Sequence, residues 1–341
     1  MRGLVIKSTG SSYIVRLDDG TSVECHVKGN FRIRGIRTTN PVAVGDYVEV
    51  ESQKSKVESS EAGFWITEVK ERRNYIIRRS TNLSKESHIL AANIDQVALI
   101  VTVNHPVTST TFIDRFLATC EAYRVRALLI FNKIDLLDEA EQAQLAELRS
   151  LYESIGYETF EMSAVSLQPS EILPLLAGKT TLLSGNSGVG KSTLLNALFG
   201  KEITRTGKIS DAHDKGMHTT TFSEMYELDV RRDDVRCTKE DVRCTKEDVR
   251  CTKDDVRCTK GWIIDTPGIK GFGSVDMSKE EVSHYFREIF RISRDCRFGN
   301  CTHTSEPGCA VIEAVEHGEI AMSRYESYLS LLGDCDEAKY R

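Results

Sequence analysis

Eight consecutive residues have the types and spacing of a loop that binds phosphate. The pattern G-x-x-x-x-G-K-[ST] is satisfied by Gly185, Asn186, Ser187, Gly188, Val189, Gly190, Lys191 and Ser192. The glycines allow consecutive backbone N–H groups to turn toward phosphate oxygens, and Lys191 would reach the β- and γ-phosphates. The Ser192 hydroxyl would bind Mg²⁺. Because the loop follows an apolar run and opens a helix-like run, we include Thr193 and predict a nucleoside triphosphate site.

A second group of residues indicates which base is bound. At the end of the apolar run ALLIF stand Asn132, Lys133, Ile134 and Asp135. The Asp135 carboxylate can accept from two guanine N–H groups, whereas adenine offers no such pair. Asn132 would support the loop and the Lys133 stem would lie over the purine, while one strand later Ser163 and Ala164 would contact the base edge. Together with the phosphate loop, this group predicts GTP rather than ATP.

Two further segments complete the expected phosphate and Mg²⁺ contacts. Asp265, which closes the strand-like run GWIID, would hold Mg²⁺ through water, and the Gly268 N–H would sense the γ-phosphate. Between this motif and the phosphate loop, Thr219 or Thr220 would complete the Mg²⁺ shell only while the γ-phosphate is present, as a switch I segment does. The sequence does not choose between the two threonines.

The residues expected to activate water are unusual. Ile269 stands where Ras-like enzymes place a glutamine, and isoleucine cannot orient water, so intrinsic hydrolysis should be slow. His218 in the switch segment could orient water or accept a proton. It could equally be an exposed loop histidine, and both interpretations stay open.

The order of these motifs along the chain is permuted. Ordinary GTPases run from the phosphate loop through switch I and DxxG to NKxD and SA. Here the base motifs at 132–135 and 163–164 precede the phosphate loop at 185–192 and DTPG at 265–268. The order predicts the same sheet, cut between DxxG and NKxD. The chain after DTPG then enters the C-terminal residues directly, so those residues should respond to the nucleotide.

Three cysteines and a histidine have the spacing of a metal site. Cys296, Cys301, His303 and Cys309 offer three thiolates and one imidazole, the ligand set of a tetrahedral structural Zn²⁺ ion. Four ligands leave no open position for catalysis, so the metal would stabilise a small domain. Reduced core cysteines beside a surface histidine are the alternative. Cys25, Cys120 and Cys335 are interpreted as packing residues.

Composition limits the class of protein. The chain has 341 residues, 40% hydrophobic and 28% charged, which is typical of two or three soluble globular domains and excludes a disordered chain, a collagen and a disulfide miniprotein. No apolar run approaches the roughly 20 residues of a membrane span, and the start resembles no signal peptide, so we expect a cytoplasmic protein. The net charge of −6 divides into +4 over residues 1–90 and −10 over the rest, which suggests an anionic partner for the N-terminal part.

The pattern of elements predicts a multidomain α/β protein. Residues 1–72 read as five short strands of an OB-fold barrel, 73–90 as a linker, and 91–275 as strands alternating with helices in a doubly wound, mostly parallel sheet. Residues 276–341 read as helices around the cysteine cluster. A basic stretch of the barrel is a candidate RNA face, with a charged hairpin as the alternative, and its candidate residues are Lys28, Phe31, Arg32, Arg34 and Arg37.

Residues 234–260 form an internal repeat, DVRCTKE, DVRCTKE, DVRCTKD and DVRCTK. The seven-residue period with Thr at one seam position makes a poor coiled coil, and in a strand an odd period places successive valines on opposite faces. We therefore interpret the repeat as an exposed insertion, mobile or an extended hairpin. A cysteine metal site is a less favoured alternative, because the spacing matches no known ligand pattern.

In its permuted motifs, OB-like start and C-x4-C-x-H-x5-C tail, the chain resembles the RsgA (YjeQ) family of GTPases that depend on the small ribosomal subunit. The resemblance implies three domains, a barrel and a zinc domain that contact 16S rRNA, and hydrolysis stimulated by the subunit, followed by release of other assembly factors. It places the GTP site on 132–135 and 185–192, the zinc ligands on the four residues named above and the switch histidine on His218. The repeat at 234–260 departs from the family, whose connection there is short.

We therefore expect a GTPase that assists late maturation of the small ribosomal subunit, acts as a monomer, uses Mg²⁺ with GTP and holds one structural Zn²⁺. Two alternatives stay open. One is an RNA-binding module that uses GTP only as a ligand, and the other is a permuted GTPase that acts on another RNA.

Overall fold

The structure is a computed structural model of the whole chain, and residues 1–9, 12–27, 41–53, 63–79, 87–200, 223–230, 259–265 and 277–337 are described. Several predicted residues lie outside these ranges, and their predictions stay open. They are Lys28, Phe31, Arg32, Arg34 and Arg37 of the basic stretch, His218, Thr219 and Thr220 of the switch segment, Gly268 and Ile269 of the DTPG region, and residues 234–258 of the repeat.

The N-terminal strands form a closed five-stranded barrel. They are β1 (Arg2–Ser8), β2 (Tyr13–Leu17), β3 (Ser22–Val27), β4 (Tyr47–Gln53) and β5 (Gly63–Val69). Neighbouring pairs are β1–β2, β2–β3, β3–β5, β5–β4 and β4–β1, so the last strand returns to the first. Alternate residues point inward, and Val5, Val15, Cys25, Val50 and Ile66 are fully buried. The five strands and the packing role of Cys25 agree with the sequence prediction.

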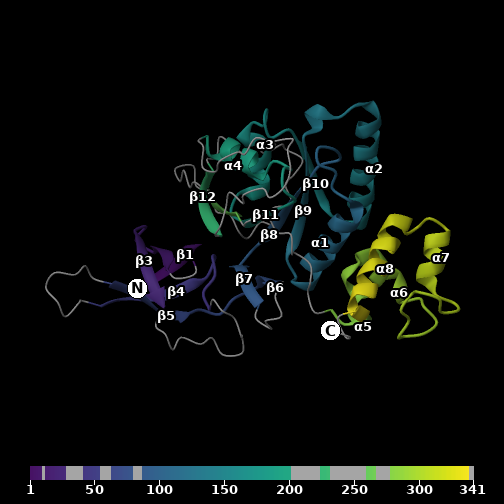
Figure 1. Cartoon of the computed structure of the whole chain (residues 1–341), viewed down its shortest axis with the longest axis horizontal. Helices are drawn as coiled ribbons and strands as arrows, with labels where there is room; N and C mark the ends of the chain where they lie inside the picture. The colour runs from purple at the N-terminus through teal and green to yellow at the C-terminus, as the bar shows by residue number, and fades with distance from the viewer. Residues whose placement is uncertain are drawn as a thin grey trace, which may run out of the picture.

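The central unit is a six-stranded sheet with helices on both faces (Figure 1). Its order is β10 (Glu158–Met162), β9 (Arg126–Asn132), β8 (Gln96–Val101), β11 (Thr180–Ser184), β13 (Thr259–Asp265) and β12 (Glu224–Val230). All neighbours are parallel except β12 and β13. Every residue of β8 is buried, as expected of a strand covered on both sides.

Two hydrophobic cores lie on the two faces of this sheet. One contains residues of α1 (Thr110–Ala122) and α2 (Glu139–Ile155), and the other contains residues of α3 (Pro169–Leu176) and α4 (Lys191–Phe199). A capping box at Asp138 and Glu141 starts α2, and Gly156 at φ 97° ends it. The doubly wound architecture predicted from the alternation of strands and helices is confirmed.

The segment 73–90, which the sequence suggested to be a linker, contains a two-stranded antiparallel sheet. Its strands are β6 (Tyr75–Arg79) and β7 (Ser87–Ala92). Ile76 and Ala91 are fully buried in the core shared with β8 and α1. The basic and polar composition of the segment gave no indication of this burial. The hairpin joins the barrel to the sheet, because Ala92 N–H donates to the Val44 carbonyl at 2.9 Å.

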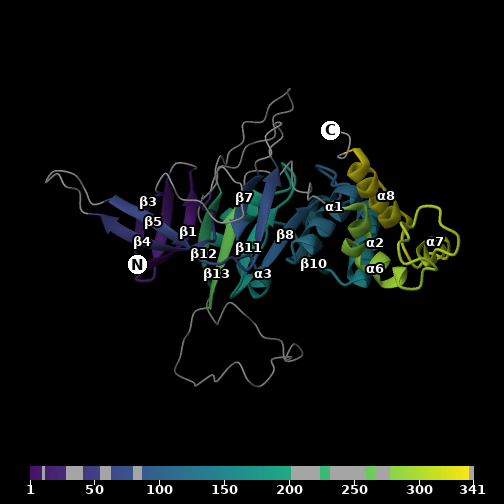
Figure 2. The ribbon, with the colours of Figure 1, turned by 90° about the horizontal axis from the view of Figure 1, so that it is seen from below.

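The C-terminal residues are helical, as predicted. They form α5 (Lys279–Val282), a 3-10 turn η3 (Ser283–Tyr285), α6 (Arg287–Ser293), α7 (Ala310–Glu316) and α8 (Met322–Glu337). Figure 2 shows the barrel, the sheet and these helices arranged in a row, with α8 against α1. Among the described residues, no helix combines the length and apolar composition needed to cross a membrane.

The repeat connects two strands that are paired at its ends. Val230 closes β12 and is the partner of Thr259, which opens β13. The two strands that flank residues 231–258 are therefore paired up to the residues next to that segment.

Candidate guanine nucleotide site and metal cluster

The phosphate loop lies where the sequence placed it, between the end of β11 and the start of α4. Two of its glycines are required by close contacts. A Cβ at Gly185, where φ is 143°, would lie 2.5 Å from the Ile100 carbonyl oxygen, and one at Gly190, where φ is 102°, would lie 2.3 Å from the Asn132 Nδ2. The loop is therefore held against the strand ends on which the base motif stands.

The Asn132 side chain connects the three predicted parts of the site. Its Nδ2 donates to the Val189 carbonyl at 2.7 Å, and its Oδ1 accepts from the Ala164 N–H at 2.9 Å. The side chain is 3% exposed, so both hydrogen bonds are shielded from water. The base motif, the phosphate loop and the Ser163–Ala164 pair thus form one structure, although they lie up to 57 residues apart.

The residues predicted to contact the base follow the neighbouring strands β9 and β10. Lys133 adopts the left-handed conformation at φ 66°, and Asp135 in the following turn is exposed to solvent. Burial lowers the pKa of Lys133, and the nearby Asp135 carboxylate partly opposes this shift. The Ser163 Oγ is buried and has no hydrogen-bond partner among the described residues. A buried hydroxyl of this kind fits a ligand with hydrogen-bonding edges.

A loop that the sequence analysis missed forms another wall of the site. Residues 102–109 follow β8, and the Lys133 Nζ donates to the His105 carbonyl at 2.5 Å. A Cβ at Gly188 would lie 3.6 Å from the Pro106 Cδ. The only available signal was the position of this loop at the carboxyl end of a central parallel strand, where ligands bind in such sheets.

Those predicted phosphate and Mg²⁺ residues that the structure describes also lie at this edge. The Lys191 Nζ donates to the Gly185 and Asn186 carbonyls at 2.6 and 2.7 Å. Burial lowers the pKa of Lys191, and the Asp265 carboxylate opposes the shift. Asp265 is 4% exposed and ends β13 beside Leu183 of β11, while Ser192 lies in the first turn of α4. Ser192 and Asp265 supply the hard oxygen donors that Mg²⁺ prefers.

The three cysteines and the histidine meet in a compact cluster in the C-terminal helical region. The ligand atoms of Cys296, Cys301, His303 and Cys309 all lie within 4.8 Å of one another. The His303 Nδ1 is 3.6 Å from the Cys296 Sγ and 3.4 Å from the Cys309 Sγ. The cluster could hold one metal ion, as the spacing predicted.

Neighbouring side chains fix the backbone that carries these ligands. The Glu306 carboxylate accepts from the N–H groups of Thr302, Thr304 and Ser305 at 2.7–3.1 Å, and hydrogen bonds to Thr302 hold the pKa of Glu306 well below its usual value against the effect of burial. The Tyr325 and Tyr328 hydroxyls donate to the His303 and Thr302 carbonyls, both at 2.7 Å. Helix α8 therefore orients the ligand loop, a support that metal sites commonly need.

Comparison with known proteins agrees with this architecture. The model of the RsgA N-terminal domain matches residues 2–58, that of the RsgA GTPase matches 69–233, and that of the 50S ribosome-binding GTPase matches 180–298. The small ribosomal subunit biogenesis GTPase RsgA of Phocaeicola vulgatus is 54% identical, with 100% of this chain and 99% of that protein covered. This chain belongs to the RsgA family. The RsgA of Porphyromonas gingivalis is 52% identical over the same shares.

Two solved structures have a similar fold over almost the whole chain. YjeQ from Thermotoga maritima is 31% identical, with a TM-score of 0.67 and 98% of each chain covered. YloQ, a circularly permuted GTPase, is 27% identical, with a TM-score of 0.66 and 100% of this chain and 96% of that chain covered. The permuted arrangement predicted from motif order is confirmed, and so is the GTP hydrolase class.

Proposed function

We propose that this chain is a GTPase that binds the small ribosomal subunit late in its maturation. The subunit stimulates hydrolysis of GTP to GDP and phosphate, and the GDP form then dissociates and helps to release other assembly factors. The observation that carries the proposal is the Asn132 amide, which joins the guanine motif to the phosphate loop in a permuted chain. The names of the relatives at 52–54% identity support the choice of subunit.

Each site residue has a role in this proposal. Asp135 reads guanine, the Lys133 stem covers the purine, Ser163 and Ala164 contact the base edge, and Lys191 holds the β- and γ-phosphates. Mg²⁺ neutralises charge on the phosphates when bound. Its proposed ligands are Ser192, Asp265 and either Thr219 or Thr220. The Gly268 N–H is the proposed group that senses the γ-phosphate. His218 is the proposed residue that orients the attacking water or accepts its proton.

The dimensions of the cysteine cluster support zinc as its metal. Ideal tetrahedral Zn–S and Zn–N bonds would place sulfurs about 3.8 Å apart and sulfur about 3.5 Å from nitrogen. The Cys296 and Cys309 sulfurs are 3.9 Å apart, and the two sulfur–nitrogen distances are 3.6 and 3.4 Å. Four donors leave no position for substrate, so the ion would be structural.

The proposed partner is 16S rRNA, contacted by the barrel and by the metal-binding helices. The candidate contacts on the barrel are Lys28, Phe31, Arg32, Arg34 and Arg37. We further propose that the protein works as a monomer in the cytoplasm, because each predicted site is assembled from this one chain.

Phosphate release from GTP tests the proposal. We expect small ribosomal subunits to stimulate release at least tenfold, and Lys191→Ala to abolish the stimulated rate. Stimulation by large subunits alone would favour a GTPase that acts on another RNA. Tight GTP binding without turnover in any condition would indicate an RNA-binding module. Co-sedimentation with small subunits should require a non-hydrolysable GTP analogue and be weak with GDP.

A further inference from the structure

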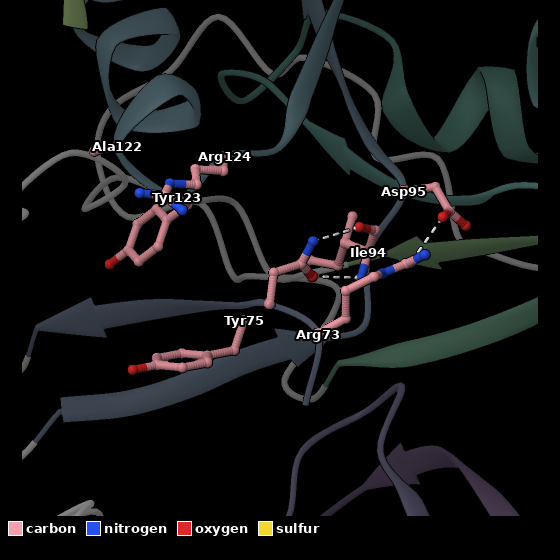
Figure 3. Close-up of a pocket in the computed structure, with 8 residues that line it drawn as sticks. Arg73, Tyr75, Ile94, Asp95, Ala122, Tyr123 and Arg124 are labelled. Carbon is pink, nitrogen blue, oxygen red and sulfur yellow. Dashed lines mark hydrogen bonds and ion pairs between the residues drawn. The ribbon is translucent and has the colours of Figure 1, made fainter. Parts of the chain in front are cut away.

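A cavity of about 440 Å³ lies on the edge of the sheet opposite the nucleotide site. Ile94 and Asp95 in its wall precede β8, and Tyr123 and Arg124 follow α1, whereas the phosphate loop and the base motif stand at the carboxyl ends of the strands. The hairpin strand β6 supplies Tyr75 (Figure 3). The volume falls within the range of about 300–1,000 Å³ typical of small-ligand sites. None of the residues in its wall takes part in the function proposed above.

Hydrogen bonds fix the floor of this cavity. The Asn74 side chain exchanges two hydrogen bonds with the Ile94 backbone, both at 2.8 Å. Arg73 donates to the Asp95 carboxylate at 2.7 Å, and that carboxylate also accepts from the Thr180 N–H at 2.7 Å. The Asp95 charge is therefore compensated, and the cavity needs little rearrangement to bind a ligand.

The walls combine aromatic rings with a cation. Figure 3 shows Tyr75 and Tyr123, which come from different elements, extending toward the same opening. The Arg124 side chain, which Figure 3 shows beside Tyr123, is exposed and makes no hydrogen bond or ion pair with another described residue. Since Arg73 is paired with Asp95, Arg124 gives this wall a net positive charge.

The backbone at Arg124 is the third observation. Its φ is +54°, at the position after a helix end where glycine or asparagine is favoured. A cation at a helix C-terminus is favourable, but that effect does not require the left-handed residue itself to be arginine. An exposed arginine held in this conformation, in the wall of a cavity that two tyrosines also line, indicates that its side chain binds a ligand rather than stabilises the fold.

We propose that this cavity binds one nucleotide unit, its base against Tyr75 and Tyr123 and its phosphate on Arg124. Aromatic stacking with an adjacent arginine is the chemistry by which proteins hold unpaired bases without sequence preference. The unit could belong to single-stranded RNA or to a free mononucleotide. We favour the RNA strand, because the cavity is open at the surface, and this choice rests on the proposed action on a ribosomal subunit.

The test uses the full chain saturated with GDP, so that the guanine site is occupied. A labelled single-stranded RNA of about eight nucleotides is titrated and followed by fluorescence anisotropy. Arg124→Gly should weaken binding about tenfold, and Arg124→Lys should retain most of it. Arg149→Ala, which removes an exposed cation on α2, is the control and should change binding less than twofold.

The glycine variant separates binding from folding. Because glycine accepts φ +54° without strain, the melting temperature of the Arg124→Gly protein should be no lower than that of the parent chain. RNA containing 4-thiouridine should crosslink to Tyr75 or Tyr123, as located by mass spectrometry. Displacement of this RNA by nucleoside monophosphates at similar nucleotide concentration would assign the cavity to a free nucleotide rather than to RNA.

Two results would overturn the inference: RNA affinity unchanged by Arg124→Gly, or crosslinks confined to other surfaces. Either result would mean that the cavity binds a protein or no ligand, and not RNA. Subunit-stimulated phosphate release is a separate measurement. If it fails while Arg124-dependent RNA binding persists, the proposed function is wrong and the nucleotide cavity stands.

Discussion

At the scale of single residues, the candidate nucleotide site depends on buried polar atoms with defined partners. Asn132 uses both ends of its amide to hold loops that meet only in the folded chain. Motif spacing predicted which residues gather here, because the residues that bind a phosphate or a base lie in short continuous segments with characteristic side chains. It did not predict the His105 carbonyl that binds Lys133, because any residue type can supply a backbone carbonyl.

Asp135→Asn should shift preference from guanosine toward xanthosine nucleotides. In the proposed site the carboxylate accepts hydrogen bonds from two guanine N–H groups, whereas an amide can donate to the xanthine oxygen. Asp135 is exposed, so the fold should persist. Calorimetric titration with GTP and XTP should show GTP affinity lowered at least tenfold and XTP affinity raised.

Exposed Asp138, the N-cap residue of α2, provides the matched control. Asp138→Asn keeps a capping side chain and should leave both nucleotide affinities unchanged. GTP affinity that is insensitive to Asp135→Asn would show that the base is read elsewhere.

At the scale of elements, the C-terminal helices dock onto α1 through a buried arginine. Arg324 of α8 is 1% exposed and donates to Asp114 of α1 at 2.7 Å and to Glu288 of α6 at 2.6 Å. Tyr152 of α2 donates to the same Asp114 carboxylate at 2.9 Å. Four helices thus share one charged cluster, which fixes their relative orientation.

Arg324→Met should lower the free energy of unfolding by about 3–5 kcal/mol, because it leaves two carboxylates buried without a cation. Chemical denaturation followed by circular dichroism measures the change. Arg115→Ala breaks another α1–α8 ion pair, with Asp334, but that pair is partly exposed and should contribute less than about 1 kcal/mol. Equal effects of the two substitutions would contradict the central role of the buried cluster.

If the cysteine cluster holds the proposed zinc, removing that ion should destabilise the helical region selectively. Burial raises the pKa of Cys301 to about 12, so its thiol is protonated at neutral pH when no metal is bound. Without a metal, no ligand bonds connect the four side chains of the cluster. Chelator-treated protein should show faster hydrogen exchange over 296–309, with GTP affinity unchanged. Cys309→Ser should lose the metal, measured by mass spectrometry, whereas Cys335→Ser outside the cluster should retain it.

The elements differ in how far the sequence predicted them. Five barrel strands and the parallel strands of the central sheet were readable, because their apolar residues alternate or run continuously. Strand β12 was missed because Glu224, Glu227 and Asp229 interrupt its apolar pattern, and α3 was missed because it contains Pro169 and Pro174. The Arg324–Asp114 contact spans 210 residues and leaves no local signal.

At the scale of the whole molecule, the repeat can be removed at a defined place. Val230 and Thr259 are paired, so an Asn-Gly turn replacing 231–258 should connect β12 and β13 without strain. GTP affinity should change less than twofold, and the melting temperature should stay equal or rise because a long loop is no longer closed. A chain that fails to fold after this replacement would show that the repeat is structural.

The barrel is attached to the strand that follows the switch segment. Lys7 of β1 pairs with Glu224 of β12 at 3.2 Å, and Arg16 of β2 pairs with Glu227 at 2.5 Å. The sequence between the end of α4 at Gly200 and the start of β12 contains the threonines expected at Mg²⁺. This stretch therefore has one end on the phosphate-loop helix and the other beside the barrel. We therefore expect a partner that displaces the barrel to act first on β12, the strand that follows those threonines in the chain.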